Sequence, residues 1–147
     1  MKRVVALLAL AAATPADARR HHDGYDTPTD THVDLVLGLW HDDALRPGEG
    51  WHRYGFTAEA TGDVAVQMRA PVDAKTVWSY LRVDGGGTSW AGVGNRRTNL
   101  CEIILHVERG AHYEVIATSQ RNASLGPTER PIADGPYTIA VVPLARR

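Results

Sequence analysis

Two short clusters of histidine and aspartate are the parts of this sequence best suited to metal or acid–base chemistry. His41, Asp42 and Asp43 are consecutive, and His52 follows shortly after them. Imidazole nitrogens and carboxylates can hold Zn²⁺, carboxylate oxygens alone can hold Ca²⁺, and a histidine–carboxylate pair can act as a general base. The second cluster is denser but lies in a polar stretch without expected order; it consists of His21, His22, Asp23 and Asp26.

Neither cluster has the spacing of a dedicated site. A calcium loop distributes its carboxylates over about 12 residues, and a zinc site needs rigid ligands with supporting hydrogen bonds. No serine stands in the Gly-x-Ser-x-Gly setting of a hydrolase nucleophile, and glycines 85–87 lack the Lys-Ser/Thr of a phosphate loop. His52, His106 and His112 are expected to face outward. We therefore predict no catalytic residues and no cofactor, with a small metal-binding or hydrolytic enzyme built on 41–43 and His52 as the alternative.

Charge and cysteine content exclude other classes of protein. The chain has 16 basic and 17 acidic residues, whereas a nucleic-acid binder needs a basic excess. One cysteine excludes a disulfide within the chain and a zinc site of several cysteines. Cys101 lies in an apolar run, so we expect a buried, unreactive thiol. A length of 147 residues, 44% of them hydrophobic, is typical of a single globular domain.

Residues 1–18 have the pattern of a secretory signal peptide. Lys2 and Arg3 precede the apolar run 4–13, and Ala16-Asp17-Ala18 supplies the small-x-small pattern of a cleavage site, which we place after Ala18. The apolar run is shorter than the roughly 20 residues that span a membrane. The mature chain is therefore expected to be exported to the periplasm or outside the cell, without a membrane span. Arginine far outnumbers lysine, which is typical of a GC-rich bacterial genome.

Alternating hydrophobicity predicts about eight strands and almost no helix. Residues 19–31 are polar and form an expected flexible lead-in, so the domain spans 32–147. The expected strands include 34–40, 51–60, 64–69, 77–84, 100–108, 112–119 and 136–142. The second and third of these are expected to form a hairpin, while 41–50 and 120–135 form loops. This succession predicts an all-β fold, an antiparallel jelly-roll-like β-sandwich.

Aromatic and arginine residues mark the candidate binding surface. In 77–84 the aliphatic residues alternate with Trp78 and Tyr80, and alternation alone leaves open which set faces the core. With the aliphatic set inside, the two aromatic rings form an outward platform for a sugar ring or a partner protein. Trp90 lies in a glycine-containing excursion, 88–97, where we expect an exposed contact together with Arg96 and Arg97.

Four segments resemble the bacterial pre-peptidase C-terminal domain. They are WHRYGFTAEATGDVAVQM (51–68), VDAKTVWSYLRV (72–83), RGAHYEVIATS (109–119) and ADGPYTIAVV (133–142). The resemblance covers nearly all of the expected mature chain and implies a jelly-roll-like sandwich that serves as a noncatalytic accessory module. One segment departs from the family pattern, because 92–99 reads GVGNRRTN where the family often has an acidic stretch. A calcium role is therefore not carried over.

Together these observations predict an exported, noncatalytic β-sandwich that binds a protein or a polysaccharide. The predicted contacts are Trp78, Tyr80, Trp90, Arg96 and Arg97, and the weak metal candidates are His41, Asp42 and Asp43. No nucleic acid is expected as a partner.

Overall fold

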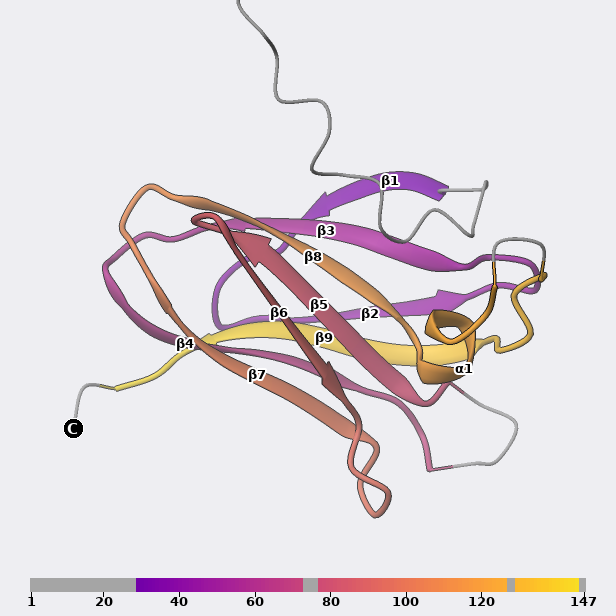
Figure 1. The fold of residues 1–147 in the computed structure, drawn as a ribbon. Coiled ribbons are helices and arrows are strands. Elements are labelled where there is room, and N and C mark those ends of the chain that lie inside the picture. Colours follow the sequence, from indigo (N-terminus) through magenta and orange to yellow (C-terminus); the bar gives the residue numbers. More distant parts are fainter. Residues whose placement is uncertain (1–28, 73–76, 127–128, 146–147) are drawn as a thin grey trace, which may run out of the picture.

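The computed structural model describes residues 29–72, 77–126 and 129–145, which form two β-sheets packed face to face (Figure 1). One sheet has the strand order β1-β3-β8-β5-β6 and the other β2-β9-β4-β7. In the described residues the nine strands are β1 Thr29–Asp34, β2 Trp40–Leu45, β3 Trp51–Thr57, β4 Gly62–Arg69, β5 Ser79–Gly85, β6 Thr88–Val93, β7 Leu100–Val107, β8 His112–Ser119 and β9 Gly135–Pro143. The predicted all-β sandwich is confirmed.

The N-terminal predictions fall largely outside this description. The expected signal peptide, its cleavage after Ala18, the cluster at 21–26 and the lead-in up to residue 28 all lie outside the described residues. Strand β1 begins at Thr29, three residues before the expected domain start, and runs parallel to β3.

The core lies between the sheets and contains the residues that alternation predicted to face inward. The predicted inward residues that are buried are Tyr54, Phe56, Ala58, Val64, Val66, Met68, Cys101, Ile103, Leu105, Val107, Tyr113, Val115, Ala117, Tyr137, Ile139 and Val141. In β5 the aliphatic set is the inner one, since Val77, Leu81 and Val83 are fully buried. Phe56 stacks on Tyr113 with ring centroids 5.1 Å apart. The hydrophobic effect, through burial of these side chains, is the main contribution that holds the two sheets together.

The predicted strand 34–40 is wrong, because this segment crosses from one sheet to the other. The Leu35 N–H donates to Gly55 O in the five-stranded sheet, and the Gly38 N–H donates to Val141 O in the four-stranded sheet. Gly38 has a φ of +81°, a conformation that glycine adopts without a steric penalty. Residues 41–45, expected in a loop, consequently lie in β2.

The predicted hairpin of 51–60 with 64–69 is also wrong. β3 pairs with β1 and β8, whereas β4 pairs with β7 and β9 in the opposite sheet. Ala58 still exchanges backbone hydrogen bonds with Gly110 and Ala111, so the chain leaves the five-stranded sheet only after that residue. Alternation predicted the buried apolar sets of β3, β4, β7, β8 and β9 correctly, but it does not determine which strands are neighbours.

A tight hairpin replaces part of the excursion that was expected around Trp90. Gly86 and Gly87 have φ values of +56° and +78° and join β5 to β6, with Gly85 opposite Thr88. Two consecutive positive φ values are the geometry of a type I′ turn, for which Gly-Gly is well suited. The expected loop 120–135 contains a short helix, α1 (Gln120–Ala123), capped by Ser119. Among the described residues, no helix has the length and apolar character needed to cross a membrane.

Candidate functional site

Five polar side chains form a hydrogen-bonded group between the sheets, which we call the interior polar cluster: Asp43, Glu49, His52, Tyr54 and Tyr137. The Tyr54 hydroxyl donates to Asp43 Oδ2 and lies 2.5 Å from the Tyr137 hydroxyl. His52 Nδ1 lies 2.7 Å from the Tyr137 hydroxyl, and His52 Nε2 lies 2.9 Å from Glu49 Oε2. The cluster therefore links β3 of one sheet to β2 and β9 of the other.

Counting protons defines the direction of these hydrogen bonds. Each hydroxyl has one proton, so Tyr54 donates to Asp43 and Tyr137 donates to Tyr54. His52 must then donate from Nδ1 to Tyr137 and from Nε2 to Glu49, since a carboxylate only accepts. The chain of contacts is complete only when both ring nitrogens of His52 carry protons. A ring in that state lies between two carboxylates, with His52 Nδ1 3.2 Å from Asp43 Oδ2.

The environment of the cluster shifts three of its pKa values. Burial raises the pKa of Tyr54 far above its usual range, and the neighbouring Tyr137 and Asp43 raise it further. Burial also raises the pKa of Tyr137; its hydrogen bond to Tyr54 acts to lower it, and the charges of Asp43 and Glu49 act to raise it further. Burial of Asp43 acts to raise its pKa, but the hydrogen bonds from Tyr54 and from the Ala44 N–H, together with the nearby His52 and His41, outweigh this and lower it. Both phenols are thus held neutral and Asp43 is held ionised.

We expect the protein to lose stability as the pH rises above the unfolded tyrosine pKa of 10.0. In that range the unfolded chain releases phenolic protons that the folded chain retains, so the free energy of unfolding falls by up to about 1.4 kcal/mol per pH unit for each buried tyrosine. Asp43 acts in the opposite direction: its contribution is present above its unfolded pKa of 3.8 and is lost on acidification below that value. Urea unfolding at a series of pH values from about 8 to about 11.5 measures how steeply the free energy of unfolding falls in this alkaline range. Tyr137→Phe should make this fall less steep. An equal slope in wild type and variant would contradict the conclusion that Tyr137 is held neutral in the folded protein.

The cluster is a poor match to the metal or hydrolytic centre considered as the alternative. His52 and Asp43 do come together, but His41 only contacts the edge of the Tyr54 ring at 5.8 Å and Asp42 lies on the opposite face of β2. Within 29–72, 77–126 and 129–145, no three histidine, cysteine or acidic residues are positioned to hold a metal ion. Among the described residues, the hydrogen bonds that run from Asp43 through Tyr54, Tyr137 and His52 to Glu49 involve no serine or cysteine. The arrangement links the two sheets through side-chain hydrogen bonds.

The outward orientation expected for His52 is wrong. His52 is 4% exposed and has the same strand phase as Tyr54 and Phe56, so it faces the interior. His106 and His112 do face outward as expected. The shared phase with two aromatic core residues was the available signal for His52. No comparable signal in the sequence indicates that Tyr54 and Tyr137, 83 residues apart, contact each other.

The outer surface of the five-stranded sheet carries aromatic and arginine side chains, which we call the aromatic face: Trp51, Arg53, Trp78, Tyr80 and Arg82. Trp51 and Tyr80 lie in one cross-strand row, since both are paired with Thr118 of β8. Because neighbouring strands are about 4.8 Å apart, these two aromatic residues are separated by about 10 Å. Trp78 donates from its indole nitrogen to Gly94 O at 2.9 Å, which fixes its ring. The predicted binding residues Trp78 and Tyr80 are therefore brought onto one face.

The arginines of this face are matched by acidic residues of the same surface. Arg53 lies 5.0 Å above the Trp51 ring and its Nε is 3.5 Å from Glu114 Oε1. Arg82 Nε donates to Asp84 Oδ2 at 2.9 Å. The aromatic face therefore offers flat apolar rings beside hydrogen-bonding groups, with its charges largely balanced.

Trp90 does not lie in a loop excursion as expected, and its role as a binding contact stays a prediction. Trp90 lies in β6 opposite Val83 and packs, partly buried, against the core. Arg96 and Arg97 are exposed in the turn that joins β6 to β7, where Asn95 Oδ1 accepts from the Arg97 N–H at 2.8 Å. The Trp78 indole reaches the start of this turn through its hydrogen bond to Gly94 O, while Arg97 is among the residues that line a depression on the four-stranded sheet.

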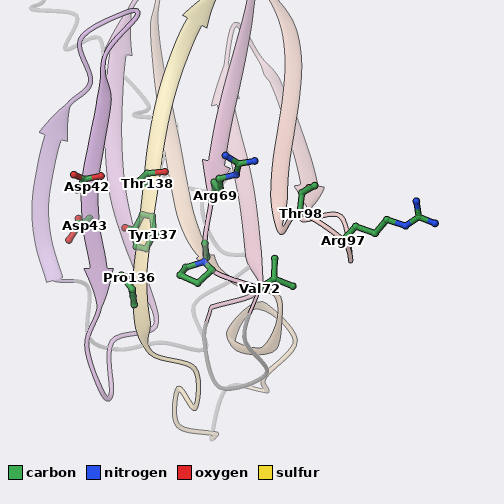
Figure 2. A pocket seen from close by; sticks show the side chains of 11 residues that line it. Asp42, Asp43, Arg69, Val72, Arg97, Thr98, Pro136, Tyr137 and Thr138 are labelled. Atoms are coloured by element: carbon green, nitrogen blue, oxygen red, sulfur yellow. The ribbon is translucent and has the colours of Figure 1, made fainter.

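A depression of about 640 Å³ lies on the four-stranded sheet, lined both by outward-facing residues and by Asp43 and Tyr137 of the interior polar cluster (Figure 2). It is lined by Asp42, Asp43, Arg69, Ala70, Pro71, Val72, Arg97, Thr98, Pro136, Tyr137 and Thr138. Asp42, Thr138 and Arg69 lie side by side across β2, β9 and β4. Figure 2 shows the Arg97 side chain pointing away from these three residues.

Cys101 is buried, as the sequence predicts. Burial raises the pKa of its thiol to about 11, so that the reactive thiolate is scarce at neutral pH.

Comparison with known proteins supports the fold and leaves the ligand open. No protein-family model matches the sequence, and no curated protein matches it. The pre-peptidase C-terminal domain of a collagenase from Bacillus anthracis has a similar structure, with a TM-score of 0.57 and 13% sequence identity over 79% of this chain and 99% of that chain. The fold expected from the sequence resemblance is thereby confirmed.

Two periplasmic inhibitors of g-type lysozyme are more distantly similar. PliG from Aeromonas hydrophila has a TM-score of 0.46 and 10% identity, over 76% of this chain and 96% of that chain. PliG from Salmonella Typhimurium has a TM-score of 0.44 and 13% identity, over 75% of this chain and 97% of that chain.

Proposed function

We propose that this chain is an exported, noncatalytic module that binds a polysaccharide or a protein through the aromatic face of the five-stranded sheet. The observation that carries the proposal is the row containing Trp51 and Tyr80, two partly exposed aromatic residues flanked by Arg53 and Arg82. Tryptophan, tyrosine and arginine are the residue types that contribute most at binding surfaces. Export is supported by the signal-like pattern of residues 1–18.

A polysaccharide fits this face better than a protein does. Aromatic residues on strands about 10 Å apart can contact successive apolar faces of sugar rings along a chain. The ion pairs of Arg53 with Glu114 and of Arg82 with Asp84 leave donors and acceptors for hydroxyl groups without a net charge that would select a charged partner. A protein partner remains the other reading, and the experiment separates the two.

The test is sedimentation of the purified protein with insoluble bacterial envelope material. Three preparations are compared: untreated, treated with protease, and treated with periodate to oxidise sugar diols. We expect binding to survive protease and to be lost after periodate. The reverse pattern would identify a protein partner, and an absence of binding to all three would contradict the proposal.

Variants test whether the aromatic face is the surface that binds. Trp51→Ala and Tyr80→Ala should each weaken binding by about tenfold or more, as expected for central aromatic contacts. Trp40→Ala is the matched control, because Trp40 is a 51% exposed tryptophan on the other sheet. Thermal melts verify that each variant is folded. If Trp40→Ala weakened binding and the other two did not, the proposed surface would be wrong.

A further inference from the structure

The depression on the four-stranded sheet is lined by two opposite charges, Asp42 and Arg69, that form no ion pair with any other described residue. Both residues are exposed. They are not paired with each other, and β9 lies between their strands, so that their backbones are about 10 Å apart. Thr138 of β9 lies between them, paired with Asp42 on one side and Arg69 on the other.

The chemistry of the lining selects for a ligand with both signs of charge. A purely anionic ligand would be repelled by Asp42, and a purely cationic one by Arg69. Arginine binds carboxylates through two parallel hydrogen bonds, and aspartate accepts from an ammonium group. A ligand that satisfies both residues has a carboxylate and an ammonium separated by about 10 Å, which is about three residues of an extended peptide.

The rest of the depression fits the body of such a peptide. The Thr138 side chain, lying midway, supplies a hydroxyl that can donate to or accept from a peptide group. Pro71, Val72 and Pro136 form an apolar border, and Val72 is 64% exposed. Ligand pockets commonly have volumes of about 300–1,000 Å³, a range that includes the 640 Å³ of this depression.

We propose that this depression binds a short extended peptide of about three residues, with its ammonium group at Asp42, its carboxylate at Arg69 and an apolar middle side chain toward Val72. The site lies on the four-stranded sheet and does not rest on the aromatic face. A free peptide and a charged segment of a protein share this chemistry. Short peptides whose termini are blocked one at a time distinguish these two ligands, because only a free peptide supplies its charges from its termini.

The experiment is a calorimetric or NMR titration of the protein with Ala-Leu-Ala carrying free termini. The same peptide is then titrated with its N-terminus acetylated and with its C-terminus amidated. We expect each block to weaken binding by about tenfold or more, since each removes one charge-assisted contact. Ala-Leu, which is too short to reach both charges, and Gly-Gly-Gly, which lacks the apolar side chain, should also bind more weakly. Equal binding of the blocked and free peptides would indicate a protein segment held by other contacts and would overturn the proposal.

Charge exchange on the protein provides the second readout. Asp42→Arg and Arg69→Asp alone should each abolish binding, whereas the double variant should restore it with the peptide reversed. Arg109→Asp in the β7–β8 turn is the matched control for a changed surface arginine and should leave binding unchanged. Glucuronic acid tests for an acidic sugar instead. If glucuronic acid bound to the wild type and to Asp42→Arg but not to Arg69→Asp, the peptide assignment would be overturned. It would also be overturned if Ala-Leu-Ala did not bind at all.

Discussion

Tyr54→Phe is expected to lower the free energy of unfolding by about 2–3 kcal/mol, because it removes a hydroxyl that bonds to an ionised group in the interior. Without that hydroxyl, Asp43 loses its donor from β3 and the Tyr137 hydroxyl loses its acceptor. Both groups then remain in a region where water cannot fully replace the lost bond. Urea unfolding at pH 7 gives the change directly. A loss below about 1 kcal/mol would mean that the cluster rearranges freely.

Tyr113→Phe is the matched control for this effect. Tyr113 is also buried, but its hydroxyl accepts a single 3.2 Å hydrogen bond from the Glu108 N–H. Its removal should cost about 1 kcal/mol or less, as for a typical neutral hydrogen bond. The double variant of Tyr54→Phe with Tyr137→Phe should cost less than the sum of the two singles, because removing both partners leaves fewer unpaired groups. Strict additivity would show that the two hydroxyls act independently.

Gly85→Ala is expected to destabilise the protein by about 3 kcal/mol or to prevent folding, which is the upper end of overpacking effects. A Cβ atom at this position would lie 2.3 Å from Cδ1 and 2.8 Å from Cε1 of Tyr113. The Tyr113 ring cannot swing away easily, because it is stacked on Phe56 in the core. Thermal unfolding followed by circular dichroism measures the loss.

Gly62→Ala is the control for a glycine replaced in a strand. A Cβ at Gly62 meets no atom within 4 Å and its φ is not positive, so stability should change by less than about 0.5 kcal/mol. The penalty of Gly85→Ala should also shrink in a Tyr113→Val background, where the clashing ring is absent. A penalty that persists there would have a cause other than contact with Tyr113.

The sequence predicted which face of each strand is buried better than which strands are neighbours. In β7, Cys101, Ile103, Leu105 and Val107 alternate with exposed residues, and this period of two identifies the buried face. The same pattern in β3 and β4 is compatible with a hairpin and with strands in opposite sheets. The backbone hydrogen bonds of Leu35, Gly38 and Ala58 show where the chain passes from one sheet to the other. The pattern of side chains in the sequence does not indicate these bonds. The crossing segments were therefore the least predictable part of the fold.

Residues of the candidate sites could be predicted only where the alternation of side chains within a single strand places them on one face. Trp78 and Tyr80 were found because they oppose an aliphatic set within one strand. The interior polar cluster depends on contacts between β2, β3 and β9, which are brought together only by the complete fold. The depression on the other sheet likewise combines Asp42, Arg69 and Thr138 from three strands far apart in the sequence. Spacing within the sequence has no signal for such combinations.

The position of β9 determines when the chain can fold. Among the strands that the structure describes, β2 pairs only with β9, and β9 also separates β2 from β4. The four-stranded sheet therefore cannot assemble before residues 135–143 have been synthesised, although β2 ends ninety residues earlier. Such non-local pairing is slow to form. Folding is therefore expected to end with the insertion of the C-terminal strand between β2 and β4, two strands that are not paired with each other.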